Sequence, residues 1–271
     1  MARGTAGRKN KNQQNIRYFY EPVPNRGFML SAAKIKYIHS LKVKKYRKKY
    51  SEFIAEGRKV IKELAEEGLP LKELYIQDNR IGNWEVDLFR KAVVVSETEL
   101  KKISGLTQPS EALAVFGIPQ HEIHQVPAGE WILLLDDIQD PGNMGTIIRT
   151  ADWFGIKTII CSEGCVDAYN PKVVQASMAS VGRVNIKETE LVKFLKEHPY
   201  VPVYGAVLDG RNYRQQDFSK PGIILIGNEG HGINAEALKF ITQPVTIPRV
   251  GKAESLNAGI ATALICAQAC L

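Results

Sequence analysis

The stretch LLLDDIQDPGNMGTIIRTADWFG, residues 133–155, decides the fold predicted for this chain. The apolar run at 131–135 has the length of a strand buried in a parallel sheet. A turn at 140–142 follows, and apolar residues then recur at helical spacing and form one face. Gly155 is a typical helix end, and residues 157–161, KTIIC, have the composition of the next strand. The stretch therefore predicts a parallel βαβ unit.

Two polar residues of this predicted helix are candidates for a functional site. Asn143 stands where an N-cap is expected, with its side-chain oxygen free to accept a backbone N–H. Arg149 projects away from the apolar face. Ligands of open α/β sheets bind at the carboxyl ends of the strands, which is where Asn143 lies. An ordinary surface arginine is the alternative interpretation of Arg149.

The composition is that of a soluble globular protein. The chain has 271 residues, of which 44% are hydrophobic and 24% charged, enough for one large or two ordinary domains. It contains no apolar run of membrane-spanning length, and its basic N-terminus lacks the apolar core of a secretory signal. We therefore expect a cytoplasmic protein that does not enter a membrane.

Charge is concentrated at the N-terminus. The first 50 residues hold 14 of the 36 Lys and Arg residues but only Glu21 of the 29 acidic residues. This asymmetry predicts a polyanionic partner, with nucleic acid ahead of an acidic membrane surface; a solvated tail is the alternative. Residues 1–28 have no periodicity and are expected to be a disordered basic arm, whether native, a cloning remnant or the product of a misplaced start.

The four cysteines form two Cys-x-x-x-Cys pairs, Cys161 with Cys165 and Cys266 with Cys270. Such spacing is compatible with a zinc site. However, Cys161 closes a predicted strand and the second pair lies on an apolar C-terminal helix. Reduced thiols without metal are therefore the favoured interpretation.

Residues 29–119 predict a small α/β domain. A helix begins after Ser31, and the basic run KVKKYRKKY at 42–50 interleaves cations with tyrosines, a composition suited to phosphates and unpaired bases. Alternating short strands and helices continue to residue 117, and residues 120–130 have the composition of a linker. The candidate RNA-binding residues are Lys44, Lys45, Arg47, Lys48, Lys49 and Arg58.

Residues 131–271 predict a second α/β domain whose strand ends are rich in glycine. Further strands are expected at 201–207, 223–226 and 245–247, and a helix runs to the C-terminus. The strand at 223–226 leads into GNEGHG, residues 227–232. This is not the G-x-G-x-x-G fingerprint of dinucleotide-binding folds, which argues against a nicotinamide or flavin enzyme.

Three motifs carry a family resemblance. NMGTIIRTADWFG, LIGNEGHGI and IPRVGKAESLNAGIATALI, in this order, resemble the three motifs of the SpoU (TrmH) family of RNA 2′-O-ribose methyltransferases in the SPOUT superfamily. The residues after Asn257 and the run at 177–180 depart mildly from the family pattern. The segment KYRKKYSEFIAEGRKV, residues 45–60, is similar to the substrate-binding domain that precedes many SpoU catalytic domains, itself similar to RNA-binding ribosomal proteins.

The resemblance implies an α/β SPOUT fold with a mostly parallel sheet and a C-terminal deep trefoil knot, acting as a homodimer. It implies S-adenosylmethionine as cofactor, no metal, and methyl transfer to a ribose 2′-hydroxyl of RNA, with 23S ribosomal RNA favoured over tRNA. The positions that match cofactor contacts are Gly205, Ile226, Gly227, Ile247, Leu256 and Asn257.

The resemblance also assigns the catalytic residues, which are Asn143, Arg149, Glu229, Ser255 and Asn257. Arg149 is expected to grip an RNA phosphate and to act either as base or as stabiliser of the developing alkoxide. Asn143 is expected to hold the ribose or Arg149, while Glu229 and Ser255 orient Arg149 and the loop. A catalytically inactive RNA-binding protein on the same fold and a methyltransferase for bases or protein are the alternatives.

Overall fold

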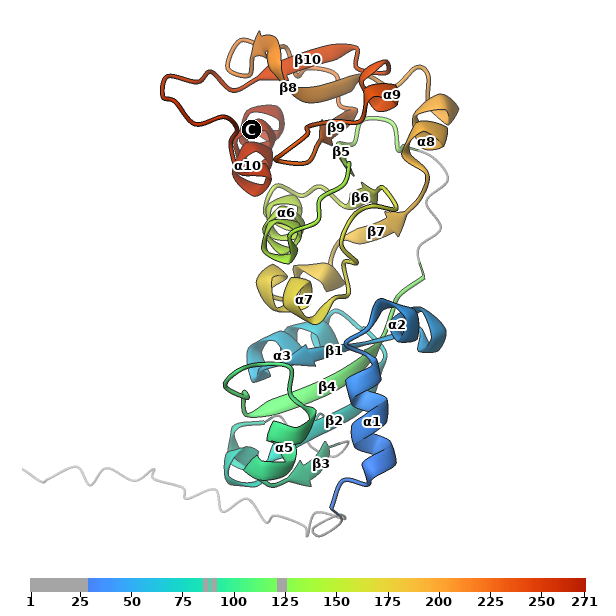
Figure 1. Cartoon of the computed structure of the whole chain (residues 1–271), viewed down its shortest axis with the longest axis vertical. Coiled ribbons are helices and arrows are strands. Elements are labelled where there is room, and N and C mark those ends of the chain that lie inside the picture. Colours follow the sequence, from blue (N-terminus) through green and yellow to red (C-terminus); the bar gives the residue numbers. More distant parts are fainter. Residues whose placement is uncertain (1–28, 85–87, 89–91, 121–125) are drawn as a thin grey trace, which may run out of the picture.

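The computed structural model describes residues 29–84, 88, 92–120 and 126–271, so the predicted basic arm at 1–28 lies outside the described residues. The described chain forms two sheets, one above the other in Figure 1. The first is built from residues 52–117 and the second from residues 132–246. The predicted domain boundaries at 119 and 131 remain a prediction.

The N-terminal sheet is mixed, in the order β1-β4-β2-β3. Its strands are β1 (Glu52–Glu56), β2 (Leu71–Gln77), β3 (Ala92–Val95) and β4 (Ala112–Gly117). Its helices are α1 (Ala32–Ser40), α2 (Lys44–Tyr50), α3 (Arg58–Glu66), the 3₁₀ helix η1 (Asp78–Asn83) and α5 (Glu97–Ile103). Ser31 caps α1 as predicted, because its side chain accepts the Lys34 N–H.

The C-terminal sheet is parallel throughout, in the order β10-β8-β9-β5-β6-β7. Its strands are β5 (Ile132–Leu135), β6 (Thr158–Cys161), β7 (Asn185–Glu188), β8 (Val203–Asn212), β9 (Ile223–Ile226) and β10 (Gln243–Thr246). The central strands ILLL, IILI and TIIC are buried at every position, as expected when both faces of a parallel sheet are covered. The predicted α/β fold is confirmed; the trefoil knot remains a prediction.

Helices and one 3₁₀ turn cover this sheet. They are α6 (Pro141–Trp153), α7 (Pro171–Ser177), η2 (Ser180–Gly182), α8 (Leu191–Glu197), α9 (Ala235–Leu238) and α10 (Ala258–Cys270). The sequence analysis missed β7 and α9 because both are short and neither carries a long apolar pattern. No helix within the described residues is both long and apolar enough to cross a bilayer.

The strand order places a topological switch between β5 and β9. From β5 the chain adds β6 and β7 on one side, whereas β9, β8 and β10 lie on the other. Connections therefore leave the carboxyl ends of β5 and β9 in opposite directions, which opens a crevice between them. The predicted βαβ unit is confirmed, because β5 pairs in parallel with β6 through α6.

Asp140, not Asn143, caps α6. Its side chain accepts the backbone N–H of Asn143 at 2.8 Å, and Pro141 occupies the first turn, where no N–H is needed. The prediction of Asn143 as N-cap is therefore wrong. This shift frees the Asn143 side chain for other partners.

Close helix packing fixes α6 between α7 and α10, which flank it in Figure 1. A Cβ atom on Gly145 would lie 2.4 Å from that of Ala176 in α7. A Cβ on Gly259 of α10 would lie 3.0 Å from Thr146 Cγ2. Small residues at these contacts therefore set where the first turns of α6 and α10 meet.

Buried and charged contacts join the two sheets. Arg47, 2% exposed, donates to Asp167 through Nε at 2.7 Å and pairs with it through Nη2 at 2.6 Å. Phe53 and Tyr169 rings pack at 5.0 Å. Arg183 donates to Asp152 of α6 at 2.8 Å and reaches Glu63 of α3 at 3.3 Å. These contacts hold the N-terminal unit against the loop and helices of the C-terminal unit.

Candidate functional site

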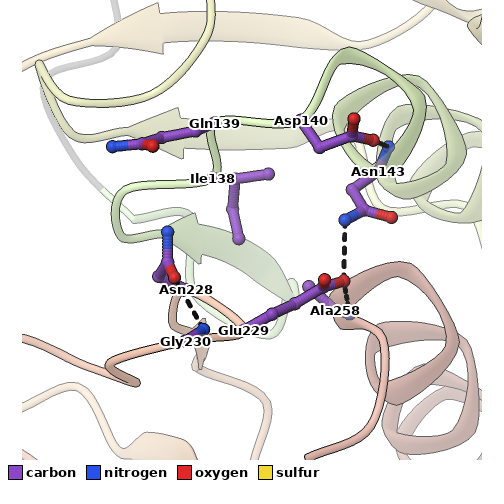
Figure 2. A pocket seen from close by; sticks show the side chains of 8 residues that line it. All are labelled: Ile138, Gln139, Asp140, Asn143, Asn228, Glu229, Gly230 and Ala258. Atoms are coloured by element: carbon purple, nitrogen blue, oxygen red, sulfur yellow. Dashed lines mark hydrogen bonds between the residues drawn. The ribbon is translucent and has the colours of Figure 1, made fainter.

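Three residues from the three sequence motifs meet at the N-termini of α6 and α10. Asn143 donates from Nδ2 to Glu229 Oε1 at 2.7 Å, as Figure 2 shows. Asn257 donates from Nδ2 to Asn143 Oδ1 at 2.7 Å. The same Glu229 oxygen accepts the backbone N–H of Ala258 at 2.8 Å. Residues far apart in the sequence therefore form one hydrogen-bonded junction.

The direction of each bond in this junction follows from the α10 cap. Asn257 is the N-cap of α10, and its Oδ1 accepts the Ile260 N–H at 3.1 Å. Its amide nitrogen must therefore point at Asn143, whose oxygen accepts and whose nitrogen then faces Glu229. The carboxylate lies at the positive end of α10, where a negative charge is stabilised.

A pocket of about 280 Å³ adjoins the junction at the carboxyl ends of β5 and β9. Figure 2 shows the residues that line it, which are Ile138, Gln139, Asp140, Asn143, Asn228, Glu229, Gly230 and Ala258. It therefore occupies the topological switch point, the expected ligand position in an open α/β sheet. Of the predicted catalytic residues, Asn143 and Glu229 line it.

The loop that carries Asn228 and Glu229 is held in shape from both sides. Asn228 Oδ1 accepts the Gly230 N–H at 2.8 Å, and its Nδ2 donates to the Asp137 carbonyl at 2.8 Å. His231 Nε2 lies 3.0 Å from Asp137 Oδ2. Asp137 itself has φ 56°, an uncommon value for a residue with a side chain. These contacts tie the loop after β9 to the loop after β5.

Arg149 is exposed on α6, away from the junction. Six residues separate it from Asn143, which is about 9 Å along the helix axis. Within the described parts of the chain its side chain makes no hydrogen bond or ion pair, and Ser255 is exposed likewise. Glu229 binds Asn143 and the start of α10 directly, so any effect on Arg149 acts through helix α6, and its predicted role in orienting Arg149 stays a prediction.

The candidate cofactor residues lie on or directly after three adjacent strands, with Gly205 in the first part of β8 beside the end of β9. Gly205 lies in β8, Ile226 ends β9 with Gly227 after it, and Ile247 follows β10. These strands are neighbours in the sheet order. Leu256 and Asn257 approach from the chain that leads into α10.

The two glycines are closely packed within the protein, while their predicted contact with the cofactor stays a prediction. A Cβ on Gly205 would lie 2.2 Å from Ile241 Cδ1. A Cβ on Gly227 would lie 2.4 Å from the carbonyl carbon of Gly232, where the loop closes on itself through bonds between Asn228 and Gly232. Glycine at these positions brings the strand ends and their loops together.

The residues present fit the adenosine part of S-adenosylmethionine. Ile226 is buried, Ile247 half-buried and Leu256 43% exposed, so they offer apolar surface beside solvent. Among the described residues, the exposed chain at 249–256 uses one backbone group internally, the Ala253 carbonyl that accepts from Arg249 at 3.0 Å. Its other amides and carbonyls are available to a purine edge or an amino-acid group.

The candidate RNA-binding residues separate into two groups. Arg47 is buried against Asp167 and the Leu41 carbonyl, so it is unavailable to a phosphate and leaves the candidate set. Lys44 and Lys48 both pair with Glu188, at 2.7 and 2.9 Å. Burial alone would raise the pKa of Glu188, but these two ammonium groups hold that pKa below its usual value.

The other candidates face solvent or a local partner. Lys45 and Lys49 are exposed. Arg58 lies 3.6 Å from Glu111 and remains partly exposed. The basic run therefore contributes both to the joint between the two units and to the outer surface.

Sequence reasoning assigned no site role to six pocket residues, which are Ile138, Gln139, Asp140, Asn228, Gly230 and Ala258. Only their position after a predicted strand or at the start of a predicted helix, and not their residue type, could have marked them as site residues. Five of them lie in the loops after β5 and β9 and Ala258 begins α10, and neither local segment shows the strand order that brings these loops together.

Comparisons with known proteins identify the family. Residues 130–267 match the SpoU rRNA Methylase family, and residues 32–114 match the MRM3-like substrate binding domain. The chain is 29% identical over 235 residues to the 23S rRNA (guanosine(2553)-2′-O)-methyltransferase RlmP of Bacillus subtilis, covering 86% of this chain and 94% of that protein.

Solved structures give the same result. A protein of the TrmH family from Porphyromonas gingivalis has a TM-score of 0.79 and 37% identity, covering 89% of this chain and 98% of that one. The AdoMet-bound rRNA methyltransferase from Sinorhizobium meliloti has a TM-score of 0.79 and 30% identity, covering 88% and 95%. With its three motifs joined at one junction, and similarity along nearly the whole described length, the chain belongs to the SpoU rRNA methylase family.

Proposed function

We propose that the protein transfers the methyl group of S-adenosylmethionine to a ribose 2′-hydroxyl of ribosomal RNA. The observation that carries the proposal is the junction of Asn143, Glu229 and Asn257 at the switch point, beside strand ends suited to the cofactor. The similar rRNA methyltransferase structure is AdoMet-bound, and the B. subtilis relative is named for 2′-O-methylation of 23S rRNA. By that similarity we propose 23S rRNA as the substrate ahead of tRNA, and a cytoplasmic location.

The ribose 2′-hydroxyl is a poor nucleophile, so the proposed reaction needs an active site that activates it. The cofactor supplies an electrophilic methyl group on a sulfonium. The acceptor alcohol is weakly acidic, so a residue must position it and stabilise negative charge; as the carbon–oxygen bond forms, the carbon–sulfur bond breaks, S-adenosylhomocysteine leaves as a neutral thioether, and the hydroxyl proton passes to solvent. The Arg149 guanidinium keeps its proton, and its planar donors suit an RNA phosphate beside the reacting ribose. We assign it to phosphate binding and alkoxide stabilisation.

The junction residues act by holding elements in place. Glu229 joins Asn143 at the start of α6 to Ala258 at the start of α10, so the helix that carries Arg149 keeps its position relative to the cofactor residues. Asn257 fixes the end of the exposed chain at 249–256, which includes Ser255. We propose these as positioning residues, with residues 29–119 as an RNA-binding domain, 120–130 as linker and 131–271 as catalytic domain.

We also propose a homodimer, supported by apolar side chains left exposed beside the site. Trp153 on α6 is 83% exposed and Ile260 on α10 is 52% exposed. Covering such residues gains free energy in proportion to the apolar area buried. Light scattering at micromolar concentration should give twice the chain mass, and Trp153→Ala should shift the equilibrium toward monomer. A monomeric wild type would contradict the dimer.

Two measurements test the function. Calorimetry should detect binding of S-adenosylmethionine, which an inactive RNA-binding protein on this fold would not need. Ribosomal RNA transcribed in vitro and incubated with enzyme and cofactor should yield a 2′-O-methylated nucleoside after nuclease digestion. A methylated base, or methylated protein in place of RNA, would contradict ribose as the acceptor.

A further inference from the structure

Helix α2 has two faces with different partners. Residues 44, 47 and 48 lie at helical spacing on one face, and all three bind acidic residues of the catalytic half, Asp167 and Glu188. The buried Arg47 pair is the anchor of this face, because its guanidinium also donates to the Leu41 carbonyl at 2.9 Å. The inner face therefore fixes α2 against the catalytic half.

The outer face carries an exposed aromatic pair. Tyr46 and Tyr50 lie four residues apart, with ring planes 16° from parallel and centroids 6.4 Å apart. They are 36% and 40% exposed, which leaves ring surface open to solvent. Lys45 and Lys49 lie on the same exposed side, and Lys49 Nζ sits 5.4 Å from the Tyr50 centroid.

This pair is ordered before any partner arrives. The Tyr37 ring packs edge-on against Tyr50, with ring centroids 5.5 Å apart and ring planes at 74°. Tyr37 is itself held, because its hydroxyl donates to the Glu52 carboxylate. Binding on Tyr46 and Tyr50 therefore costs little side-chain ordering, which raises the affinity available from stacking.

The two rings offer a stacking surface to a nucleobase. A centroid separation of 6.4 Å with near-parallel planes is typical of an offset-stacked aromatic pair, so a base would stack on the exposed ring surface and not between the rings. Lys45 and Lys49 are exposed on the same helix, where they can contact the phosphates of that strand.

We propose that Tyr46 and Tyr50 form a stacking site for one unpaired nucleobase of the substrate RNA, held at a fixed place relative to the catalytic half by the inner face of α2. Duplex RNA does not fit, because its bases are stacked on each other and their faces are covered. This inference rests on the proposed function, since it states that the RNA substrate has an unpaired base, which the enzyme binds at a second site on α2.

The test uses a short single-stranded RNA that contains 2-aminopurine, whose fluorescence falls on stacking, and the same sequence annealed to its complement. Wild-type protein should bind the single strand and quench the probe. Tyr46→Ala and Tyr50→Ala should weaken binding roughly 5- to 150-fold and abolish quenching, the range for losing one base–aromatic stack. Tyr46→Phe should retain both properties.

Matched controls separate stacking from folding. Tyr200 is 97% exposed at a distance from α2 in the sequence, so Tyr200→Ala should bind and quench like wild type. Tyr46→Leu keeps apolar packing without a π face and should still lose quenching. Unchanged binding of S-adenosylmethionine will confirm that each variant is folded.

The outcomes are distinct. Quenching that survives both tyrosine-to-alanine changes, or tyrosine-dependent binding of the duplex as tight as of the single strand, would overturn the stacking site. If wild type quenches the probe but methylates no ribosomal RNA, the proposed reaction is wrong while the stacking site stands.

Discussion

Replacing Arg149 by alanine should abolish methyl transfer while leaving the cofactor bound with an affinity within a few-fold of wild type. Arg149 is exposed and makes no hydrogen bond or ion pair with another described residue, so its loss should change the free energy of unfolding by about 0.5 kcal/mol or less. Loss of one preorganised electrostatic stabiliser lowers kcat by about 10²–10³-fold. Single-turnover methylation of ribosomal RNA, with cofactor binding by calorimetry, measures both quantities.

Two further variants make the Arg149 result specific. Arg149→Lys keeps the charge but not the planar pair of donors, so it should recover only part of the rate. Arg214 is also exposed, contacts its neighbour Tyr213 and lies outside the proposed site, so Arg214→Ala should behave as wild type. Near-normal turnover by Arg149→Ala would remove this residue from the mechanism.

Methylation rate and stability should respond differently to removal of the Glu229 carboxylate and to removal of its negative charge alone. Glu229→Ala removes the acceptor of both Asn143 Nδ2 and the Ala258 N–H, so the starts of α6 and α10 lose their common partner. Misplacement of a catalytic group by 1 Å costs on the order of 10²-fold in rate, and losing a helix-terminal acceptor costs about 1 kcal/mol of stability. Methylation rate and thermal unfolding report the two effects.

Glu229→Gln is the matched control, because its amide oxygen can accept the same two hydrogen bonds. It should unfold within about 1 kcal/mol of wild type, the typical value of a charge at a helix N-terminus, and keep activity within about tenfold. If the glutamine variant is folded yet as inactive as the alanine variant, the carboxylate charge takes part in the reaction and the positioning role is wrong.

The sequence predicts the elements of this fold well where apolar runs are bounded by turn residues. The strands around ILLL, TIIC and IILI and the cap of α1 all appear as expected. The α6 cap does not, because two capping residues lie within one turn and Pro141 selects the earlier one. Local pattern alone does not decide between Asp140 and Asn143.

The site was predictable in its residues but not in its connections. The motifs identify Asn143, Glu229 and Asn257 as candidates, whereas the bonds among them depend on the sheet order that brings β9 beside β5. Likewise, the sequence of the basic run at 42–50 predicts a single cationic surface. Only the acidic side chains of Asp167 and Glu188, more than a hundred residues later, reveal which cations are paired within the chain.

The junction of Asn143, Glu229 and Asn257 cannot form until the end of the chain has been synthesised on the ribosome. Asn143 and Glu229 are translated long before Asn257 and Ala258, which provide their remaining partners. A nascent chain whose last residues are still inside the ribosome contains Asn143 and Glu229 but lacks the two groups at the start of α10 that bind them. Such a chain should be inactive toward the RNA around it, so methylation competence begins only when the C-terminal helix docks.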